Sequence, residues 1–273
     1  MKNIIQRTFS GLVYLIIVIG SLILGKYTFG AVFLLIGILA LIEFYTISGI
    51  FKSRPYALMG ILIGAMAFII SFLVVTQLIA AGYLSLLVML PLLAMIGMLY
   101  DNNNRALPGF TGMIAGVLYI FLPLVLMLCL AFPPVTNHLY TYRIILGILS
   151  LIWINDTSAY LFGITIGRHR LFQRISPKKS WEGFIGGSLI TILISLWMNK
   201  LTGILSVTDW IILAVIVSVF GVYGDLAESL IKRNYNRKDS GSIIPGHGGV
   251  LDRIDSILFV MPVAYFYLII QQI

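Results

Sequence analysis

Charged residues are scarce in this sequence, and acidic ones are the scarcest. Only 10% of the 273 residues are charged, 60% are apolar, and Asp and Glu together number ten. Soluble domains carry far more charge, and apolar runs of about 20 residues recur along this chain. We therefore exclude a soluble globular fold and predict an all-α, polytopic integral membrane protein that lacks a soluble domain.

Cysteine is almost absent as well. The single one, Cys129, falls within an apolar run and has no partner for an intramolecular disulfide or a thiolate zinc site, so we expect a core residue. Transit peptides, lipidation motifs and internal repeats are also missing. The apolar stretch after Lys2 and Arg7 lacks the small residues of a signal-peptide cleavage site, so we expect an uncleaved first helix.

Apolar runs long enough to cross about 30 Å of hydrocarbon predict nine transmembrane helices. They lie near 9–25, 30–48, 57–75, 80–100, 110–132, 144–163, 183–198, 207–230 and 254–270. The boundary between the third and the fourth, around 76–82, is the least distinct. Nine crossings place the two ends of the chain on opposite sides of the membrane.

Basic residues are unevenly distributed over the predicted loops, and cytoplasmic loops retain Lys and Arg. With a cytoplasmic N-terminus, 15 of the 18 basic residues fall inside, and only Lys26, Arg143 and Lys200 fall outside. We therefore predict this orientation, with long cytosolic loops over 164–182 and 231–253, in a bacterial inner (plasma) membrane. The topology rule accounts for most of the net charge of +8, so no nucleic-acid partner is needed.

The few acids are concentrated in the second half of the chain. Glu43 and Asp101 are the only ones in the first 140 residues, and the remainder holds eight. We interpret the chain as one membrane domain, 1–273, in which 1–100 form packing or subunit-contact helices and 101–273 carry the function. Glu43 is expected to pair or to extend toward the inner interface rather than to catalyse.

Two acid pairs stand at the inner ends of the last two predicted helices. Asp225 and Glu228, and likewise Asp252 and Asp255, are three residues apart and so project from one helix face. A carboxylate at the membrane centre costs roughly 2.5–3.5 kcal/mol and needs a compensating cation. Neighbouring bases can supply it, but four carboxylates on adjacent helix ends also match the oxygen ligands of Mg²⁺ bound with substrate phosphates. We predict metal ligation by these acids.

The segment between the acid pairs has the composition of a phosphate-binding loop. It reads KRNYNRKDSGSIIPGHGG. Glycines around His247 let backbone N–H groups approach an anion, and Lys232, Arg233 and Lys238 supply positive charge. A simple turn would use Pro245 and the same glycines.

A second polar constellation surrounds the other long loop. The residues NDTS at 155–158 are expected to interrupt the sixth helix, and GRHRLFQRISPKKSWEG follows. Ser176 before Pro177 is typical of an N-cap followed by proline at the first helical position, and predicts a helix start there. The positive-inside bias explains the bases of this loop but leaves Asp156 and Glu182 unexplained.

These segments together resemble those of the phosphatidate cytidylyltransferases, also called CDP-diacylglycerol synthases. The stretch SLIKRNYNRKDSGSIIPGHGGVLDRID, residues 229–255, is similar to the family's characteristic motif, and NDTSAYLFG and SPKKSWEGFIGG are similar to its other blocks. Ser180 stands where threonine is more usual and keeps the hydroxyl group. The resemblance covers the entire chain and is most specific over 155–256.

The resemblance implies transfer of the cytidylyl group from CTP to phosphatidate, giving CDP-diacylglycerol and pyrophosphate in phospholipid biosynthesis, with one or two Mg²⁺ ions. Membrane lipids and a second copy in a homodimer are the implied partners, and the implied active site faces the cytoplasm. The implied catalytic residues are Lys232, Arg233, Lys238, Asp239, His247 and Arg253; the substrate-binding residues are Asn155, Asp156, Ser176, Lys178, Lys179, Ser180, Glu182, Ser229, Gly248 and Gly249; and the metal ligands are Asp225, Glu228, Asp252 and Asp255.

The implied reaction limits what His247 needs to do. The attacking phosphate monoester has a second pKa of about 6 and is already largely ionised at neutral pH, so a base has little to remove. We expect His247 either to donate a hydrogen bond to phosphate or to shape its loop.

Two other kinds of function remain open. A cation-coupled transporter also places acids in broken helices, which the interruption at 155–158 matches but the basic glycine–histidine loop does not. A CTP-dependent lipid kinase, or a transferase acting on another lipid phosphate, uses similar groups. It differs in whether the product retains the cytidylyl group.

Overall fold

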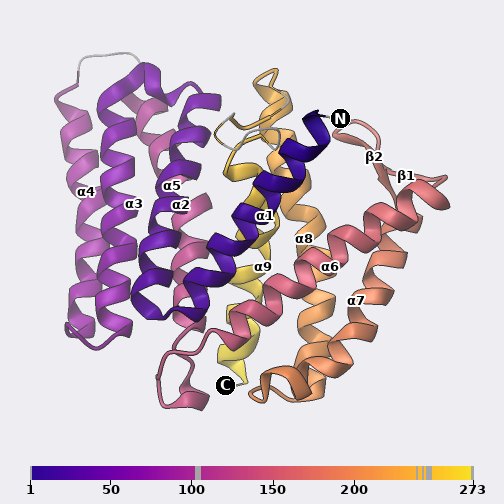
Figure 1. The fold of residues 1–273 in the computed structure, drawn as a ribbon. Helices are drawn as coiled ribbons and strands as arrows, with labels where there is room; N and C mark the ends of the chain where they lie inside the picture. Colours follow the sequence, from indigo (N-terminus) through magenta and orange to yellow (C-terminus); the bar gives the residue numbers. More distant parts are fainter. Residues whose placement is uncertain (1, 102–105, 238, 242, 244–247, 272–273) are drawn as a thin grey trace.

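Nine α-helices and one β-hairpin make up the part of the chain that the structure describes (Figure 1). The computed structural model describes residues 2–101, 106–237, 239–241, 243 and 248–271, with the backbone alone for residues 2–8. The helices are α1 (Lys2–Ile23), α2 (Lys26–Ile47), α3 (Arg54–Val75), α4 (Leu86–Leu99), α5 (Ala106–Leu130), α6 (Arg143–Thr165), α7 (Trp181–Thr202), α8 (Val207–Asn234) and α9 (Leu251–Ile270), and the strands are β1 (Arg170–Phe172) and β2 (Ser176–Ser180).

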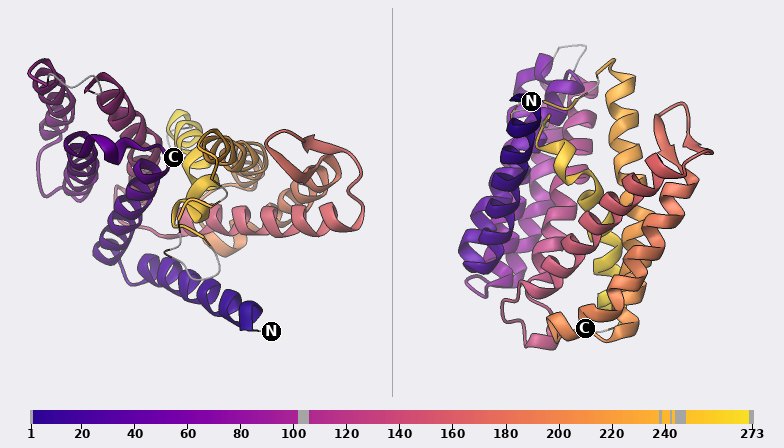
Figure 2. Two further views of the ribbon diagram at one scale, coloured as in Figure 1. Left: turned by 90° about the horizontal axis from the view of Figure 1, so that it is seen from above. Right: turned by 45° about the vertical axis from the view of Figure 1, so that its right-hand side comes forward.

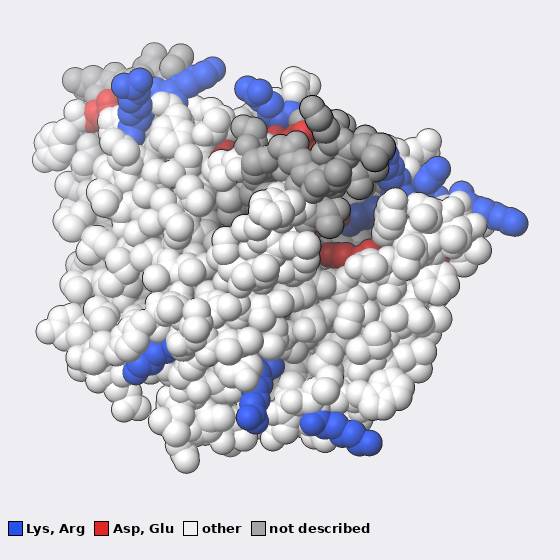
Figure 3. All heavy atoms as spheres, in the orientation of Figure 1, with Lys and Arg blue, Asp and Glu red and all other residues white. Residues whose placement is uncertain are grey.

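The helices confirm a polytopic membrane protein. Within the described residues, eight segments are long and apolar enough to span a membrane, and α1 adds a shorter apolar helix over Phe9–Ile23. Large apolar side chains such as Leu24 and Leu99 are 78% and 72% exposed, an arrangement suited to hydrocarbon surroundings. On the face shown in Figure 3, charged side chains lie mainly toward two rims, with a broad band of uncharged residues between them. Figure 1 places the start of α1 and the end of α9 at opposite ends of the bundle.

The helices form two groups that meet at α9. Helices α2 to α5 lie together, α6 to α8 form the other group, and α9 lies between them (Figures 1 and 2). Helix α9 contacts α8 on one side and both α5 and α2 on the other, while α1 runs obliquely across the bundle. Buried side chains from both groups, among them Phe33, Trp210 and Met261, belong to one continuous apolar core.

Small residues allow the helices of the second group to approach one another closely. A Cβ atom added to Gly224 of α8 would lie 2.5 Å from the carbonyl oxygen of Asp255 and 3.0 Å from Cα of Ser256, both on α9. Between α6 and α7, a Cβ on Gly187 would lie 2.9 Å from Cβ of Ala159. Membrane helices associate largely through such contacts, because lipid tails are as apolar as the side chains that they replace.

The predicted interruption of the sixth helix is wrong. Helix α6 continues through 155–158, because its polar side chains find partners without disturbing the backbone. The hydroxyl of Thr157 donates to the carbonyl of Trp153 at 2.7 Å, and the hydroxyl of Thr191 on α7 donates to Oδ1 of the buried Asn155 at 3.4 Å. The polar run therefore lies within a continuous helix, in which Asn155 contacts α7.

The predicted helix start at Ser176 and Pro177 is also wrong. These residues open β2, which pairs antiparallel with β1 so that Phe172 stands opposite Ser176. The backbone remains extended up to Ser180, whose hydroxyl oxygen accepts the Gly183 N–H at 3.2 Å. Ser180 is therefore the N-cap of α7, and the loop predicted over 164–182 contains a β-hairpin.

Most other helix boundaries lie within four residues of those predicted, but α1 begins at Lys2, seven residues before its predicted start. The least distinct one is confirmed, because α3 ends at Val75 and the next span begins at Ala81 with a 3₁₀ turn. Helix α8 continues to Asn234, one turn beyond the predicted end at Leu230. Asp225 therefore lies about 14 Å from the end of its helix, at 1.5 Å per residue.

The close contact at Gly224 can be tested by adding a single methyl group. We expect Gly224→Ala to lower the midpoint of thermal unfolding in detergent by roughly 2–10 °C, because overpacking costs about 1–3 kcal/mol. Gly221→Ala is the matched control one turn earlier on α8, since its Cβ would meet no atom closer than 3.9 Å. Tryptophan fluorescence during heating measures both, and equal midpoints would contradict a tight α8–α9 contact.

Candidate active site

A cavity of about 850 Å³ lies between α6, α7, α8, α9 and the β-hairpin. Figure 3 shows acidic side chains in a hollow beneath a rim of basic ones. The cavity brings together most of the residues predicted to be functional, from three separate parts of the sequence. Those that line it are Asn155, Asp156, Lys178, Lys179, Ser180, Asp225, Glu228, Lys232, Asp239, Asp252, Arg253 and Asp255.

Other predicted residues do not line the cavity. Among the described residues these are Ser176, Glu182, Ser229, Arg233, Gly248 and Gly249. The Ser229 hydroxyl donates to Oδ1 of Asp225 at 3.3 Å, so it supports a residue that does line the cavity. The predictions for Lys238 and His247 lie outside the described residues.

Three carboxylates converge on one side of the cavity. One oxygen each of Asp225 and Glu228 on α8 and of Asp255 on α9 lie within 4.8 Å of one another. Glu228 is 1% exposed, and its Oε1 has no hydrogen-bond partner in the described part of the chain. Carboxylate oxygens at this spacing, one of them buried without a donor, fit a divalent cation that prefers oxygen ligands.

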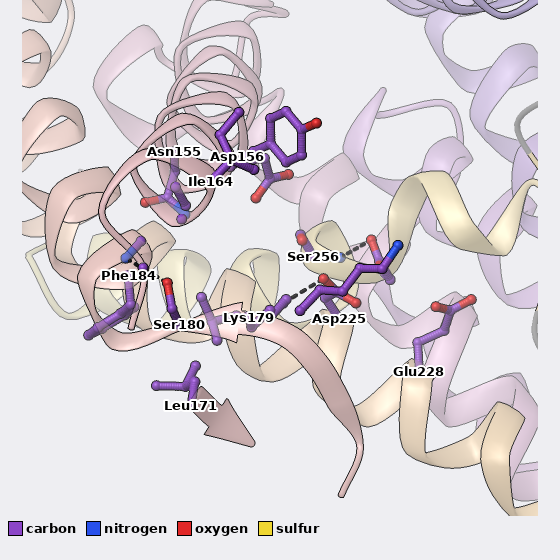
Figure 4. Close-up of a pocket in the computed structure, with 18 of the residues that line it drawn as sticks. Asn155, Asp156, Ile164, Leu171, Lys179, Ser180, Phe184, Asp225, Glu228 and Ser256 are labelled. Carbon is purple, nitrogen blue, oxygen red and sulfur yellow. Dashed lines mark hydrogen bonds and ion pairs between the residues drawn. The ribbon is translucent and has the colours of Figure 1, made fainter. Parts of the chain in front are cut away.

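Two lysines offset the charge of these acids. Lys232 Nζ lies 2.5 Å from Oε2 of Glu228 and 2.6 Å from Oδ1 of Asp252. Lys179 Nζ lies 2.5 Å from Oδ2 of Asp225 (Figure 4). Because Lys179 comes from β2, the hairpin places a cation from the loop between α6 and α7 against an acid of α8.

The fourth predicted metal ligand, Asp252, has a separate set of contacts. Besides Lys232, its carboxylate accepts the backbone N–H of Gly249 at 2.7 Å and that of Ser240 at 3.1 Å. Gly248 adopts a left-handed φ of 85°, and a Cβ there would collide with Oδ2 of Asp252. The glycine N–H group predicted to approach an anion thus binds a carboxylate of the protein itself.

Glu182 fixes the base of the hairpin at the first turn of α7. Its carboxylate accepts the backbone N–H of Arg168 at 3.1 Å and of His169 at 3.1 Å, and lies 2.6 Å from Nδ1 of His169. The Trp181 N–H donates to the carbonyl of His169 at 2.9 Å. Glu182 therefore holds the segment that leads into β1, and it is not among the described residues that line the cavity.

Sequence reasoning missed the apolar side of the cavity and one of its bases. Tyr160 and Ile164 of α6 and Phe184 of α7 line it, and Arg170 adds a positive charge from β1. The helical period carried a usable signal, because Tyr160 and Ile164 follow Asp156 at intervals of four and share its face.

Comparisons with known proteins show the family of this chain. The profile of the Cytidylyltransferase family matches residues 5–271. The phosphatidate cytidylyltransferase of Staphylococcus epidermidis is 47% identical over 129 residues, which are 46% of this chain and 49% of that protein. That of Staphylococcus aureus is 48% identical over 121 residues, 44% of this chain and 46% of that protein, and that of Staphylococcus saprophyticus is 45% identical over the same shares.

The two kinds of match differ in extent. The aligned stretch spans about half the length of the staphylococcal relatives, whereas the family profile extends over nearly all of this chain. The profile match also includes every residue that lines the cavity. The chain therefore belongs to the cytidylyltransferase family.

Proposed function

We propose that this protein transfers the cytidylyl group of CTP to phosphatidate, forming CDP-diacylglycerol and releasing pyrophosphate. The observation that carries the proposal is a cavity whose acids and bases adjoin an apolar wall among membrane-embedded helices. A nucleoside triphosphate with a divalent cation requires the charged groups, and a lipid phosphate with its acyl chains in the bilayer suits the apolar wall. The similarity to the staphylococcal phosphatidate cytidylyltransferases supports the same reaction.

In the proposed reaction, an ionised oxygen of the phosphatidate phosphate attacks the α-phosphorus of CTP. A new P–O bond forms, the bond from the α-phosphorus to the oxygen bridging to the β-phosphate breaks, and pyrophosphate leaves with the electron pair. The attacking phosphate is already largely ionised at neutral pH. The protein therefore has to position the two phosphates and to neutralise their charge, which are the main requirements of phosphoryl-type transfer.

The residues of the cavity divide these tasks. Asp225, Glu228 and Asp255 would hold Mg²⁺, which supplies charge neutralisation to the triphosphate when bound. Five bases line the same cavity and would bind phosphate oxygens: Arg170, Lys178, Lys179, Lys232 and Arg253. Lys238 and His247 keep their predicted roles toward phosphate, and Asn155 and Asp156 border the cavity from α6, where they would orient the nucleotide or the lipid head group.

The apolar side of the cavity would accommodate the glycerol and the first carbons of the lipid. Tyr160 and Ile164 are 66% and 62% exposed, so the wall that they form continues onto the outer apolar surface of the protein. We further propose that the cavity faces the cytoplasm of a bacterial plasma membrane, because its bases belong to the loops and helix ends that carry most Lys and Arg. The transporter alternative loses the helix break on which it rested, since α6 is continuous.

The position of a radioactive label tests the reaction. With purified protein, phosphatidate in detergent, Mg²⁺ and CTP labelled at the α-phosphate, we expect the label to appear in the lipid product. With CTP labelled at the γ-phosphate, we expect it in pyrophosphate. Lipid labelled only from the γ-position would instead identify a CTP-dependent lipid kinase. No CTP consumption would contradict transfer of the cytidylyl group to phosphatidate.

Removal of single carboxylates tests the proposed metal site. We expect Asp225→Asn and Asp255→Asn each to lower kcat by at least about 100-fold and to raise the Mg²⁺ concentration that gives half-maximal activity, because each loses a charged ligand. Asp209→Asn is the control: this carboxylate binds Ser206 and Tyr267 and does not line the described cavity. A magnesium midpoint left unshifted in Asp255→Asn would rule out this set of ligands.

Asp252→Asn separates metal binding from loop anchoring. Because its carboxylate contacts Lys232 and two backbone N–H groups, we expect lower activity with an unchanged magnesium midpoint. Titration of Mg²⁺ against residual activity measures this, with Asp255→Asn as the comparison. A midpoint that moves as far as in Asp255→Asn would make Asp252 a metal ligand, as the sequence alone predicted.

A further inference from the structure

A carboxylate from the N-terminal half of the chain is buried against the beginning of α9. Glu43 lies on α2 and is 3% exposed. It accepts the backbone N–H of Val250 at 3.0 Å, the N–H of Leu251 at 2.8 Å and the hydroxyl of Ser240 at 3.1 Å. These three donors lie 197 to 208 residues further along the chain, so Glu43 joins α2 to the segment that leads into the active-site helix.

The charge of Glu43 suits the position that it occupies. The first N–H groups of a helix have no partner within the helix, and its N-terminal end carries partial positive charge. The residue that precedes α9, Val250, has no side chain able to cap them. Glu43 supplies this cap from a different helix, through hydrogen bonds that are stronger than those to a neutral acceptor.

The backbone around Glu43 is shaped to hold its carboxylate closely. A Cβ atom added to Gly241 or to Gly249 would collide with the Glu43 carboxylate, and one on Gly249 would also collide with the Ser240 hydroxyl. Two glycines therefore leave the space that the carboxylate fills. Side chains in that space would force Glu43 away from its donors.

Glu43 and Asp252 hold the same short segment from two sides. The Ser240 N–H donates to Asp252 and its hydroxyl donates to Glu43, while the N–H groups of Gly249 and Val250 go to Asp252 and Glu43 respectively. One helical turn after Asp252 comes the Asp255 carboxylate. A displacement of this first turn would therefore move Asp255 relative to Asp225 and Glu228, the two acids of the proposed metal site on α8.

We propose that Glu43 is a positioning residue of the active site, which sets the placement of Asp252 and Asp255 by fixing the first turn of α9. It acts through these residues, since Glu43 does not line the described cavity. For its activity readout, this inference rests on the proposed function. The N-terminal helices, expected to serve packing or subunit contact, would then contribute to the geometry of the catalytic groups.

Glu43→Gln tests the proposal, because it keeps the side-chain volume but removes the charge and places an NH₂ group against N–H donors. Hydrogen exchange followed by mass spectrometry on the peptide 249–256 should become at least about tenfold faster. The cytidylyl-transfer assay should show kcat lowered by at least about tenfold and a raised magnesium midpoint, with the KM for phosphatidate unchanged. Glu43→Asp retains the charge on a shorter side chain. It should therefore recover part of the exchange protection and part of the activity.

Asp209→Asn is the matched control, because it also removes a helix-capping carboxylate, but at the opposite end of α8. It should lower thermal stability while leaving exchange over 249–256 and the magnesium midpoint unchanged. The proposal would be overturned if Glu43→Gln kept the hydrogen-exchange rate over 249–256 and the magnesium midpoint of the wild-type protein. It would also be overturned if Glu43→Gln and Asp209→Asn changed these two quantities equally. The two proposals can also fail separately. If exchange over 249–256 becomes faster in Glu43→Gln but the wild-type protein transfers no cytidylyl group, Glu43 holds the first turn of α9 and the proposed function is wrong.

Discussion

The acids where α8 and α9 meet repel one another, and they lie in surroundings where a charge has a high free energy. Several features of the structure compensate for this repulsion. A carboxylate at the membrane centre costs about 2.5–3.5 kcal/mol, and like charges add to the cost. Lys232 offsets Glu228 and Asp252 from within α8, and Lys179 offsets Asp225 from the hairpin. Because Lys179 depends on the position of β2, the hairpin is part of the electrostatic balance of the helix pair.

The same helix pair is fastened at both of its ends. At the start of α8, Ser206 and Asp209 form a capping box, and Asp209 also accepts the hydroxyl of Tyr267 from α9 at 2.7 Å. At the other end, Gly224 lets α9 approach closely enough for acids of both helices to share one site. Close packing and polar anchors act together here, because neither apolar burial nor dispersion alone fixes the rotation of one membrane helix against another.

The parts of this arrangement that could be predicted from sequence are those with a local period or composition. Apolar run lengths predicted the spans, and the three-residue spacing placed Asp225 with Glu228 on one face. The separation of Asp252 from Asp255 could not be predicted, because it depends on how α9 is rotated against α8. The contacts of Glu43 were equally out of reach, since a spacing of about 200 residues carries no periodic signal, although a lone acid in an apolar run is costly enough to require a partner.

The β-hairpin and the continuity of α6 were mispredicted for a related reason. Ser176 and Pro177 carry the local signal of a helix start, but pairing of β2 with β1 keeps the backbone extended as far as Ser180. The residues at 155–158 are polar enough to end a helix in isolation, yet Asn155 contacts Thr191 of α7 and the Thr157 hydroxyl donates to the carbonyl of Trp153 within the helix. In both cases a tertiary partner overrides local preference.

These two departures from local preference have a joint consequence for the cavity. An unbroken α6 carries Asp156, Tyr160 and Ile164 along one face, so a polar group is followed by an apolar wall in the same direction. The hairpin brings Lys178 and Lys179 to the same cavity. The cavity thereby combines charged groups with an apolar wall. A nucleotide can remain partly hydrated and a lipid can keep its acyl chains in the bilayer while their phosphates meet in this cavity.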